Sequence, residues 1–212
     1  MKLYIYEHCP FCIRVRYVAK MLHISLQEII VDYHDKETPI QLVGKKVVPI
    51  LIKDDGTPML ESSDIIDYLI SLKHDYVASA PAETTLQWQK KAFPLLQRIG
   101  YPRWLSLNLA EFSKEESHLA WVANKQVAEL NFDHLLEQTA EIVKHVEALA
   151  NEAEQLLNFN GTDTQASLVD QAIYYSILSG VSCEPTINWP EKLQHWLNIQ
   201  SENLALPLLK LY

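Results

Sequence analysis

The chain has 212 residues, and 48% of them are hydrophobic, so it can bury the core of one large domain or two modest ones. The net charge is −9 and uneven: residues 1–73 hold nine basic and ten acidic side chains, and residues 74–212 hold nine and seventeen. An acidic second half repels phosphates, which argues against nucleic acid as a partner.

The first 73 residues alternate between strand-like and helix-like patterns. Aromatic and β-branched runs predict strands at 2–6, 26–31, 47–53 and 57–61, and the stretches between them predict helices at 10–22, 37–46 and 62–73. Pro10 fits the first turn of its helix, Gly44 ends the second, and Ser62 is expected to be the N-cap of the third. The order β-α-β-α-β-β-α implies one parallel strand pair and an antiparallel edge.

The sequence pattern changes after residue 73. Residues 74–83 combine small residues with a Pro and are expected to form a linker, so the predicted domains are residues 1–73 and an all-helical region from 84 to 212. From Leu135 to Leu156 apolar residues recur in steps of three and four, which predicts one long helix.

Other signals mark where helices of the second half begin and end. Gly100 and Pro102 should bend or end an earlier helix. Ser167 and Asp170 form a capping box in which each side chain is expected to bond the other residue's backbone, opening a buried helix. A last helix begins near Pro190.

The chain has three cysteines, Cys9, Cys12 and Cys183. This number is small and odd, which argues against the disulfide framework of a secreted protein. The N-terminus lacks the apolar core of a signal peptide, and no apolar run is long enough to span a bilayer. We therefore expect a protein of the reducing cytoplasm without a membrane partner. Cys183 is expected to be a buried small hydrophobe.

The stretch Cys-Pro-Phe-Cys at residues 9–12 carries the chemistry. Cys9 directly precedes Pro10, so it lies at a helix N-terminus, where unpaired N–H groups and the helix dipole favour a thiolate. Cys12 follows one turn later on the same face, which suits a disulfide that opens and closes with little backbone movement. We expect Cys9 to be the attacking thiol, nearer solvent, and Cys12 the resolving thiol.

The cysteine pair admits other interpretations. A zinc site would need a second Cys or His pair, so we expect no metal, and an inert structural disulfide does not suit a reducing compartment. His8 either tunes the pKa of Cys9 or is a solvated bystander, which is the more common case. Arg14, Arg16 and Lys20 add positive charge nearby, and Glu7 opposes it.

The chain resembles the glutaredoxin 2 family, the large bacterial dithiol glutaredoxins built on a glutathione-transferase scaffold. Cys-Pro-Phe-Cys is similar to the Cys-Pro-aromatic-Cys of dithiol glutaredoxins, and "VVPI" at 47–50 is similar to their Val-cis-Pro turn. "ESSDI" at 61–65 resembles the Glu-Ser step of glutathione transferases, and the helical second half resembles their C-terminal domain. The implied fold is a thioredoxin-like α/β N-terminal domain followed by an all-α domain.

The resemblance implies a glutathione-dependent thiol–disulfide oxidoreductase with a Cys9–Cys12 redox disulfide. Pro49 would be cis, and the Val48 backbone would pair with the cysteinyl part of glutathione. Ser62 would hold the γ-glutamyl carboxylate, although it is also explained as a plain N-cap, and Glu61 would take the α-amino group. The implied glutathione-binding set is Cys9, Phe11, Val48, Pro49, Glu61 and Ser62. The candidate cations for the glycyl carboxylate are His34, Lys36, Lys45 and Lys46.

The same resemblance implies the partners. These are glutathione as co-substrate and disulfide-containing or glutathionylated proteins, with no metal or nucleotide and a monomeric chain. One alternative is a glutathione transferase or dehydroascorbate reductase, in which Tyr6 would activate the glutathione thiol rather than serve packing. Two others are an iron–sulfur carrier bound through Cys9 and an interaction module with a vestigial site. The helical half either walls one side of the substrate cleft through Tyr101, Arg103 and Trp104 or buries these three side chains.

Overall fold

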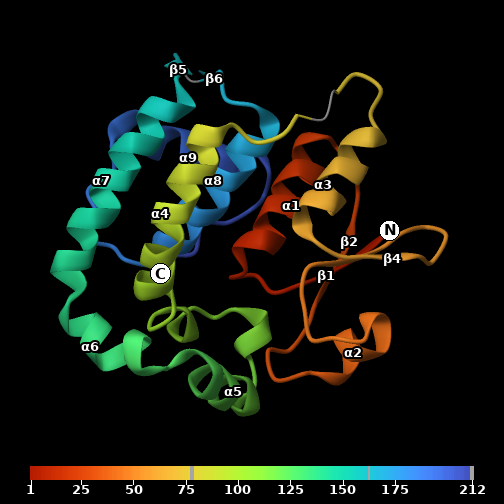
Figure 1. Ribbon diagram of the computed structural model, residues 1–212, viewed down its shortest axis with the longest axis horizontal. Helices are drawn as coiled ribbons and strands as arrows, with labels where there is room; N and C mark the ends of the chain where they lie inside the picture. Colours follow the sequence, from red (N-terminus) through yellow and green to blue (C-terminus); the bar gives the residue numbers. More distant parts are fainter. Residues whose placement is uncertain (77–78, 162, 211–212) are drawn as a thin grey trace. The chain divides into compact units, whose positions relative to one another are not determined.

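The computed structural model describes residues 1–76, 79–161 and 163–210 (Figure 1). The chain divides into two compact units. The first unit takes in residues 1–78 and 108–124, and the second takes in residues 79–107 and 125–212. The predicted division at residues 73 and 84 stays a prediction, but the structure groups 108–124, expected within the helical region, with the first unit.

The first unit is built on a four-stranded sheet in the order β2-β1-β3-β4. Strand β1 (Lys2–Ile5) pairs in parallel with β2 (Gln27–Ile30) and antiparallel with β3 (Ile50–Ile52), and β3 pairs antiparallel with β4 (Pro58–Met59). The α/β fold class and both kinds of strand pairing are therefore confirmed. The strands are shorter than predicted.

Helices α1 (Pro10–Met21) and α3 (Ser62–Ser71) lie side by side in the first unit (Figure 1). Their packed faces and the strands place branched apolar side chains in one core, because every second strand residue and every third or fourth helix residue points inward. Helix α2 (Glu37–Val43) ends at Gly44, whose φ of 77° is the left-handed conformation that glycine adopts most readily. The fully buried core residues include Leu3, Ile5, Val15, Leu51 and Leu69.

The segment 108–124 adds a 3-10 turn η2 (Ala110–Phe112) and most of helix α5 (Glu115–Lys125) to the first unit. Trp121 of α5 is fully buried and packs edge-on against the ring of Tyr33, with centroids 5.0 Å apart. The backbone N–H of Tyr33 donates to the carbonyl of Glu111 at 2.9 Å. Aromatic packing and backbone bonding therefore hold this segment in the unit that carries the Cys-Pro-Phe-Cys stretch.

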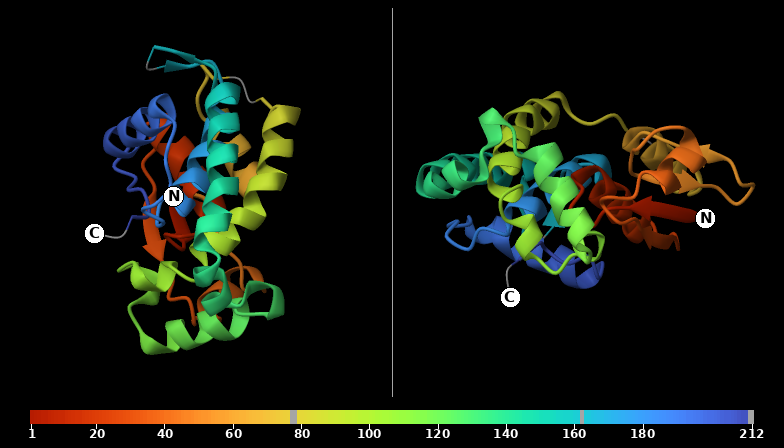
Figure 2. Two further views of the ribbon diagram at one scale, coloured as in Figure 1. Left: turned by 90° about the vertical axis from the view of Figure 1, so that its left-hand side faces the viewer. Right: turned by 90° about the horizontal axis from the view of Figure 1, so that it is seen from below.

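The second unit is helical. Helix α4 (Glu83–Gly100) packs against α7 (Thr139–Leu157) and α8 (Leu168–Val181), and α9 (Glu191–Asn203) packs against α7 (Figure 2). The remaining elements are 3-10 turns η1 (Trp104–Ser106) and η3 (Ala128–Leu130), the short helix α6 (Phe132–Glu137) and a hairpin of β5 (Phe159–Asn160) and β6 (Asp163–Thr164).

The predicted long helix from Leu135 to Leu156 is confirmed from Thr139 onward as α7, but its first residues belong to α6, because a turn at Gln138 separates the two helices. The hydroxyl of Thr139 donates to the carbonyl of Leu136 at 2.6 Å and accepts from Arg103 at 2.6 Å. A side chain that bonds the backbone in this way competes with helical hydrogen bonds. Periodicity alone does not reveal a tertiary partner of this kind.

Two other helix signals acquire physical reasons. Helix α4 ends at Gly100 as predicted, and a Cβ there would lie 2.3 Å from the ring of Trp104, so only glycine permits this close approach. Ser167 accepts from the N–H of Asp170 at 3.1 Å, as the capping box predicts. The carboxylate of Asp170, however, accepts from the Ser167 hydroxyl at 2.6 Å and from the N–H of Ala82 at 2.9 Å, so it joins the starts of α8 and α4.

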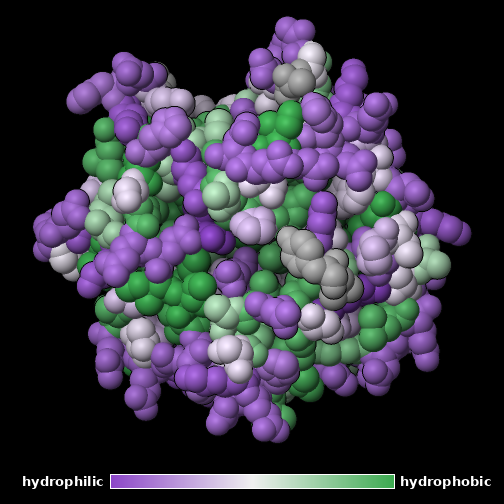
Figure 3. Space-filling view, turned by 180° about the vertical axis from the view of Figure 1, so that it is seen from behind, coloured by the Kyte–Doolittle hydropathy of each residue, from purple (hydrophilic) through white to green (hydrophobic). Residues whose placement is uncertain are grey.

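The face drawn in Figure 3 is covered mainly by hydrophilic side chains, with smaller hydrophobic patches between them. Within the described ranges, no helix combines the length and the apolar character that a membrane crossing requires.

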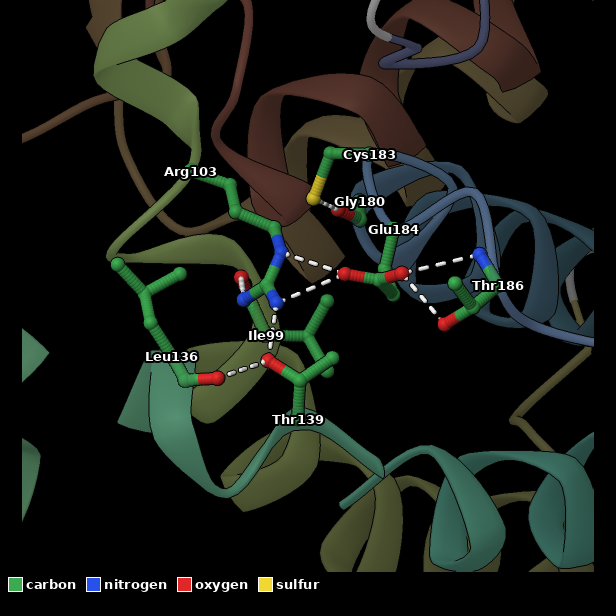
Figure 4. A network of polar contacts seen from close by, with 8 residues as sticks. All are labelled: Ile99, Arg103, Leu136, Thr139, Gly180, Cys183, Glu184 and Thr186. Carbon is green, nitrogen blue, oxygen red and sulfur yellow. Dashed lines mark hydrogen bonds and ion pairs between the residues drawn. The ribbon is translucent and has the colours of Figure 1, made fainter. Parts of the chain in front are cut away.

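A buried polar network closes one end of the second unit (Figure 4). The guanidinium of Arg103 donates to one oxygen of Glu184 at 2.8 and 2.7 Å, and also to the carbonyl of Ile99 and the hydroxyl of Thr139. The other oxygen of Glu184 accepts from the N–H and the hydroxyl of Thr186, at 2.9 and 2.6 Å. Both charged groups are therefore paired and hydrogen-bonded, as buried ions require.

Candidate redox site

The Cys-Pro-Phe-Cys stretch lies where β1 gives way to α1. Cys9 is the N-cap of α1, with φ −71° and ψ 118°, and Pro10 occupies the first helical position, where its missing N–H leaves no bond unmade. The carbonyl of Cys9 accepts the first helical bond, from Ile13 at 2.9 Å. The Cys9 sulfur therefore stands at the positive end of the helix dipole, as predicted from the sequence.

The two thiols differ in exposure and in pKa. Cys9 is 9% exposed and Cys12 is 0% exposed, and both are free thiols. The Cys12 thiol, the backbone amides of Cys12 and Phe11, and the Arg14 guanidinium lower the pKa of Cys9 against the opposing effect of burial. Burial raises the pKa of Cys12 well above its ordinary value, and the neighbouring Cys9 raises it further. The site therefore favours the thiolate on Cys9 over a thiolate on Cys12.

Arg14 supports the Cys9 thiolate from within the helix. It is buried, and burial lowers its own pKa to about 10, which still leaves it charged at neutral pH. Its guanidinium carbon lies 5.0 Å from the ring of Phe11, which is 36% exposed. Arg16 instead pairs with Glu28 at 2.8 Å, and Glu7 accepts from the N–H of Ala110 at 2.7 Å. Of the charges predicted to act on Cys9, Arg14 is among the larger causes of its lowered pKa.

The expectation that His8 is a solvated bystander is wrong. His8 is 6% exposed, and its ring stacks between Tyr6 and Phe112 with centroid distances of 5.5 and 5.2 Å. Its Nδ1 lies 2.7 Å from Oε1 of Glu111, and its backbone N–H donates to the same oxygen at 3.0 Å. Sequence reasoning missed Glu111 altogether, because it lies 103 residues from His8 and carries no local signal.

The residues expected to bind the peptide part of glutathione lie in the same unit. The Val48–Pro49 peptide bond is cis, as the resemblance implied, and it directly precedes β3. Ser62 is the first residue of α3. The prediction that Ser62 is the N-cap is wrong, because Glu61 takes the capping position with φ 62° and ψ 119°. A positive φ at a non-glycine residue is strained by about 1–3 kcal/mol and recurs at ligand sites.

The four candidate cations differ in their engagement. The ammonium of Lys46 donates to the carbonyl of Tyr33 at 2.5 Å and lies 4.6 Å from that ring, and the ring of His34 bonds Ser117 at 2.9 Å. Lys36 and Lys45 are exposed, and the Lys45 ammonium lies 3.9 Å from a Glu61 oxygen.

Comparison with known proteins places this geometry in a family. The family model described as "Glutaredoxin 2, C terminal domain" matches residues 84–211, and the one described as "Glutathione S-transferase, N-terminal domain" matches residues 3–75. The chain belongs to the glutaredoxin 2 family. This is a family of glutathione-dependent oxidoreductases, so the activity class predicted from the sequence is confirmed.

Individual relatives of the family agree along the whole chain. Glutaredoxin 2 of Escherichia coli K12 is 28% identical over 211 residues, covering 99% of this chain and 98% of the relative. The crystal structure of glutaredoxin 2 from Salmonella typhimurium in complex with glutathione superposes with a TM-score of 0.90 at 25% identity, covering 98% of this chain and 96% of the other. A glutathione S-transferase from Methylobacterium radiotolerans shares the fold, with a TM-score of 0.62 at 13% identity and coverage of 100% and 95%.

The environments of Tyr6 and Cys183 also agree with a glutaredoxin. Tyr6 is buried, and burial and the neighbouring Tyr33 raise its pKa, which favours packing over activation of a thiol. Cys183 is fully buried, as predicted, and burial raises its pKa to about 12. In the part of the chain that the structure describes, no cluster of His, Cys, Asp and Glu side chains could hold a metal ion.

Of the two interpretations of the side chains that follow α4, the structure supports burial. Tyr101, Arg103 and Trp104 are all buried within the second unit, so they do not line a cleft as one reading had it. Arg103 belongs to the network in Figure 4, and the indole N–H of Trp104 donates to the carbonyl of Gly180 at 3.0 Å.

Proposed function

We propose that this chain reduces glutathione mixed disulfides and protein disulfides by thiol–disulfide exchange through Cys9 and Cys12. The Cys9 thiolate attacks the glutathione sulfur of a mixed disulfide, a Cys9–glutathione disulfide forms, and the substrate leaves as its thiolate. A second glutathione thiolate then attacks the glutathione sulfur of this adduct, which frees Cys9 and forms glutathione disulfide. Alternatively, Cys12 attacks Cys9 and releases glutathione, and two further glutathione molecules reduce the Cys9–Cys12 disulfide.

The observation that carries this proposal is the opposite shift of the two thiol pKa values at one helix terminus. Cys9 has a lowered pKa and retains some exposure, whereas Cys12 is sealed from solvent and has a raised pKa. Attack requires an ionised and accessible sulfur, and resolution requires a second sulfur within reach that stays protonated until the first has reacted. Cys9 and Cys12 fit these two roles respectively.

We propose that glutathione binds to residues of the first unit, which also carries the cysteine pair. Among the described residues, no backbone hydrogen bond outside the regular elements engages Val48, so its N–H and carbonyl can pair with the cysteinyl residue of the tripeptide. Ser62 and the first N–H groups of the ten-residue helix α3 suit the γ-glutamyl carboxylate. Glu61, exposed and held in a strained conformation, suits the α-amino group, and Phe11 offers an exposed ring beside Cys9.

We further propose that the protein acts as a monomer in the reducing cytoplasm. The cysteine pair, the cis-proline turn and the start of α3 all belong to one unit of one chain, so no second subunit is needed to complete the set. Glutathione keeps cytoplasmic thiols reduced, and the sparse cysteine content suits that compartment.

The test is turnover of a glutathione mixed disulfide coupled to glutathione reductase. Cys9→Ser should lose all turnover, because no other thiolate stands at the helix terminus. Cys12→Ser should keep deglutathionylation, since a second glutathione resolves the adduct. Cys183→Ser is the matched control, because this buried thiol belongs to the second unit, donates to the carbonyl of Gly180 and should be dispensable for turnover. Retained turnover in Cys9→Ser would end the assignment.

A further inference from the structure

The hairpin between α7 and α8 carries an Asn-Gly pair, Asn160 followed by Gly161, which the proposed exchange reaction does not use. Both residues are exposed and belong to the second unit, and the hairpin projects beyond the end of α7 (Figure 2). Every other asparagine in the sequence is followed by a residue that has a side chain. Asn160 is therefore the asparagine whose next residue cannot shield its own backbone nitrogen.

An asparagine side chain can be attacked by the backbone nitrogen of the residue that follows it. The nitrogen of Gly161 bonds to Cγ of Asn160, ammonia leaves, and a cyclic imide forms. Water then opens the imide at either carbonyl, which yields aspartate or isoaspartate. The reaction consumes water and releases ammonia in equal amounts, so it requires no oxidant and no second protein. A side chain on the following residue would crowd the attacking nitrogen, and glycine has none.

Both reacting groups are unengaged. Within the described ranges, the side-chain amide of Asn160 makes no hydrogen bond, and no backbone bond outside the regular elements uses the N–H of Gly161. Gly161 has a φ of 67°, and a Cβ added to it would meet nothing within 4 Å. Glycine is thus required here by the left-handed backbone and not by lack of space, and the attacking nitrogen stays open to solvent.

The hairpin holds its tip weakly. Strands β5 and β6 pair through two residues each, Phe159 with Thr164 and Asn160 with Asp163. A two-stranded hairpin of this kind is marginally stable by itself, and segments with few buried contacts open locally at low cost in free energy. Attack on Cγ requires rotation about the backbone of Asn160, and opening of the tip permits this rotation.

We propose that Asn160 is a site of spontaneous deamidation, with Gly161 supplying the attacking nitrogen and a mixture of aspartate and isoaspartate as the product. The new carboxylate lies opposite Asp163 in the strand pair, and like charges directly opposite each other are destabilising. Isoaspartate also lengthens the backbone by one carbon atom, which breaks the pairing register. Deamidation therefore adds a negative charge and loosens the β5–β6 hairpin.

Hydrogen bonds at the base of the hairpin confine this change. The hydroxyl of Thr164 donates to the carbonyl of Leu157, and the side-chain amide of Asn158 donates to that of Gln165 at 2.7 Å. These bonds do not involve Asn160, so the helices on either side of the hairpin should keep their positions. Turnover of mixed disulfides is expected to be unaffected, and the inference does not depend on the proposed function.

Asn158 is a matched comparison in the same hairpin. It is exposed like Asn160, but the next residue is Phe159, and its side-chain amide is bonded to Gln165. The benzyl group of the next residue crowds the attacking nitrogen, and the hydrogen bond holds the amide away from it. Asn158 should therefore keep its amide while Asn160 loses it.

The turn between β3 and β4 offers a second comparison, the pair Asp55–Gly56, which could form the same imide. The carboxylate of Asp55 accepts from the backbone N–H of Thr57 at 2.8 Å, and hydrogen bonds from Thr57 lower the pKa of Asp55. An ionised carboxylate has no neutral leaving group to lose when a nitrogen attacks it. Asp55 should consequently stay unmodified at neutral pH under conditions in which Asn160 reacts.

The experiment ages the reduced full-length chain in mildly alkaline buffer and samples it over weeks. Peptide mapping by mass spectrometry locates each amide that has become an acid, enzymatic methylation of isoaspartate counts that product, and the released ammonia is measured. We expect Asn160 to lose its amide before any other asparagine, with isoaspartate among the products. Ammonia should appear in the same amount as modified Asn160, and the rate should rise with pH because the attacking nitrogen must lose its proton.

Three variants test the roles of the two residues. Gly161→Asn keeps a residue type that tolerates the left-handed conformation but adds a side chain beside the nitrogen, so deamidation at Asn160 should slow severalfold. Asn160→Ser removes the amide and should abolish the acid shift of the hairpin at unchanged turnover. Asn160→Asp carries the product's charge from the start, and amide hydrogen exchange in β5 and β6 should be faster than in Asn160→Ser.

The outcomes decide between the alternatives. The inference is overturned if Asn160 keeps its amide while other asparagines react, or if Gly161→Asn deamidates at Asn160 as fast as wild type. Aspartate without isoaspartate would show direct hydrolysis and remove Gly161 from the reaction. Equal hydrogen exchange in Asn160→Asp and Asn160→Ser would overturn the expected loosening of the hairpin. None of these results bears on Cys9 or Cys12, so the proposed function stands or fails separately.

Discussion

Each unit buries a carboxylate beside a nitrogen-bearing side chain, Glu184 beside Arg103 and Glu111 beside His8, but the oxygens of the two carboxylates are bonded differently. In the second unit both oxygens of Glu184 are bonded, to Arg103 on one side and Thr186 on the other (Figure 4). In the first unit one oxygen of Glu111 faces His8, and the other, among the described residues, has no hydrogen-bond partner.

This difference predicts that Glu184 and Glu111 contribute differently to the stability of their units. A fully bonded buried ion pair directs its field into its own partners, so it fixes the ends of the helices that it joins. A buried carboxylate oxygen without a hydrogen-bond partner has lost its hydration without replacement, which costs stability. Glu111 carries this cost on one of its oxygens, whereas both oxygens of Glu184 are bonded.

The largest effect on stability is expected where the satisfied pair is broken. Arg103→Met keeps the length of the side chain but leaves Glu184 buried and unpaired, which typically costs about 3–5 kcal/mol. The free energy of unfolding in urea should fall by that amount, while turnover per folded molecule stays at the wild-type level. A loss below about 1 kcal/mol would show that Glu184 finds water or another partner, and that the network does not fix the helix ends.

A smaller effect is expected in acid. The pKa of Glu184 is lowered in the folded protein: burial alone would raise it, but hydrogen bonds from Thr186 and the charge of Arg103 outweigh burial. The pKa of Glu111 is lowered as well. A carboxyl whose folded pKa lies below its unfolded value, about 4.3 for Glu, stabilises above the unfolded value and loses that contribution as pH falls through the folded one.

Wild-type protein should therefore lose stability as the pH drops below about 4.3, measured as the urea midpoint against pH. Glu184→Gln and Glu111→Gln each remove one of these titrations, so each variant should start less stable at neutral pH and lose less in acid. An acid limb as steep as that of wild type in both variants would mean that neither carboxyl has a pKa in the folded protein below its unfolded value.

Much of the first unit is predictable from the sequence because its signals are local. The strands, the helix that begins at Pro10 and the turn at Gly44 depend on residue types within a few positions of each other. The redox pair is readable for the same reason, since Cys9 and Cys12 share one turn of one helix. Ser62 was misplaced by one position because the left-handed backbone of Glu61 is not written in any local preference.

What escaped prediction depends on partners distant in the chain. The break at Gln138 arises where Thr139 bonds Arg103, which lies 36 residues away. The burial of His8 depends on Glu111, which lies 103 residues away in a segment that the pattern assigned to the helical half. A single sequence shows the chemistry of such residues but not which of them meet, and here the meeting decides their roles.

The smallest effect should come from an ion pair of similar length on the surface. Lys91 of α4 donates to both oxygens of Glu152 of α7, at 2.6 and 2.7 Å, yet the two side chains are 53% and 37% exposed. Solvent screens this pair and hydrates either partner alone, so Lys91→Ala should change the free energy of unfolding by no more than about 1 kcal/mol. The same urea titration that is used for Arg103→Met measures it. A loss as large as that of Arg103→Met would mean that joining α4 to α7 is what stabilises, and that burial of the charges is not the cause. A small loss, weakened further by added salt, would leave burial as the property that distinguishes the network around Glu184.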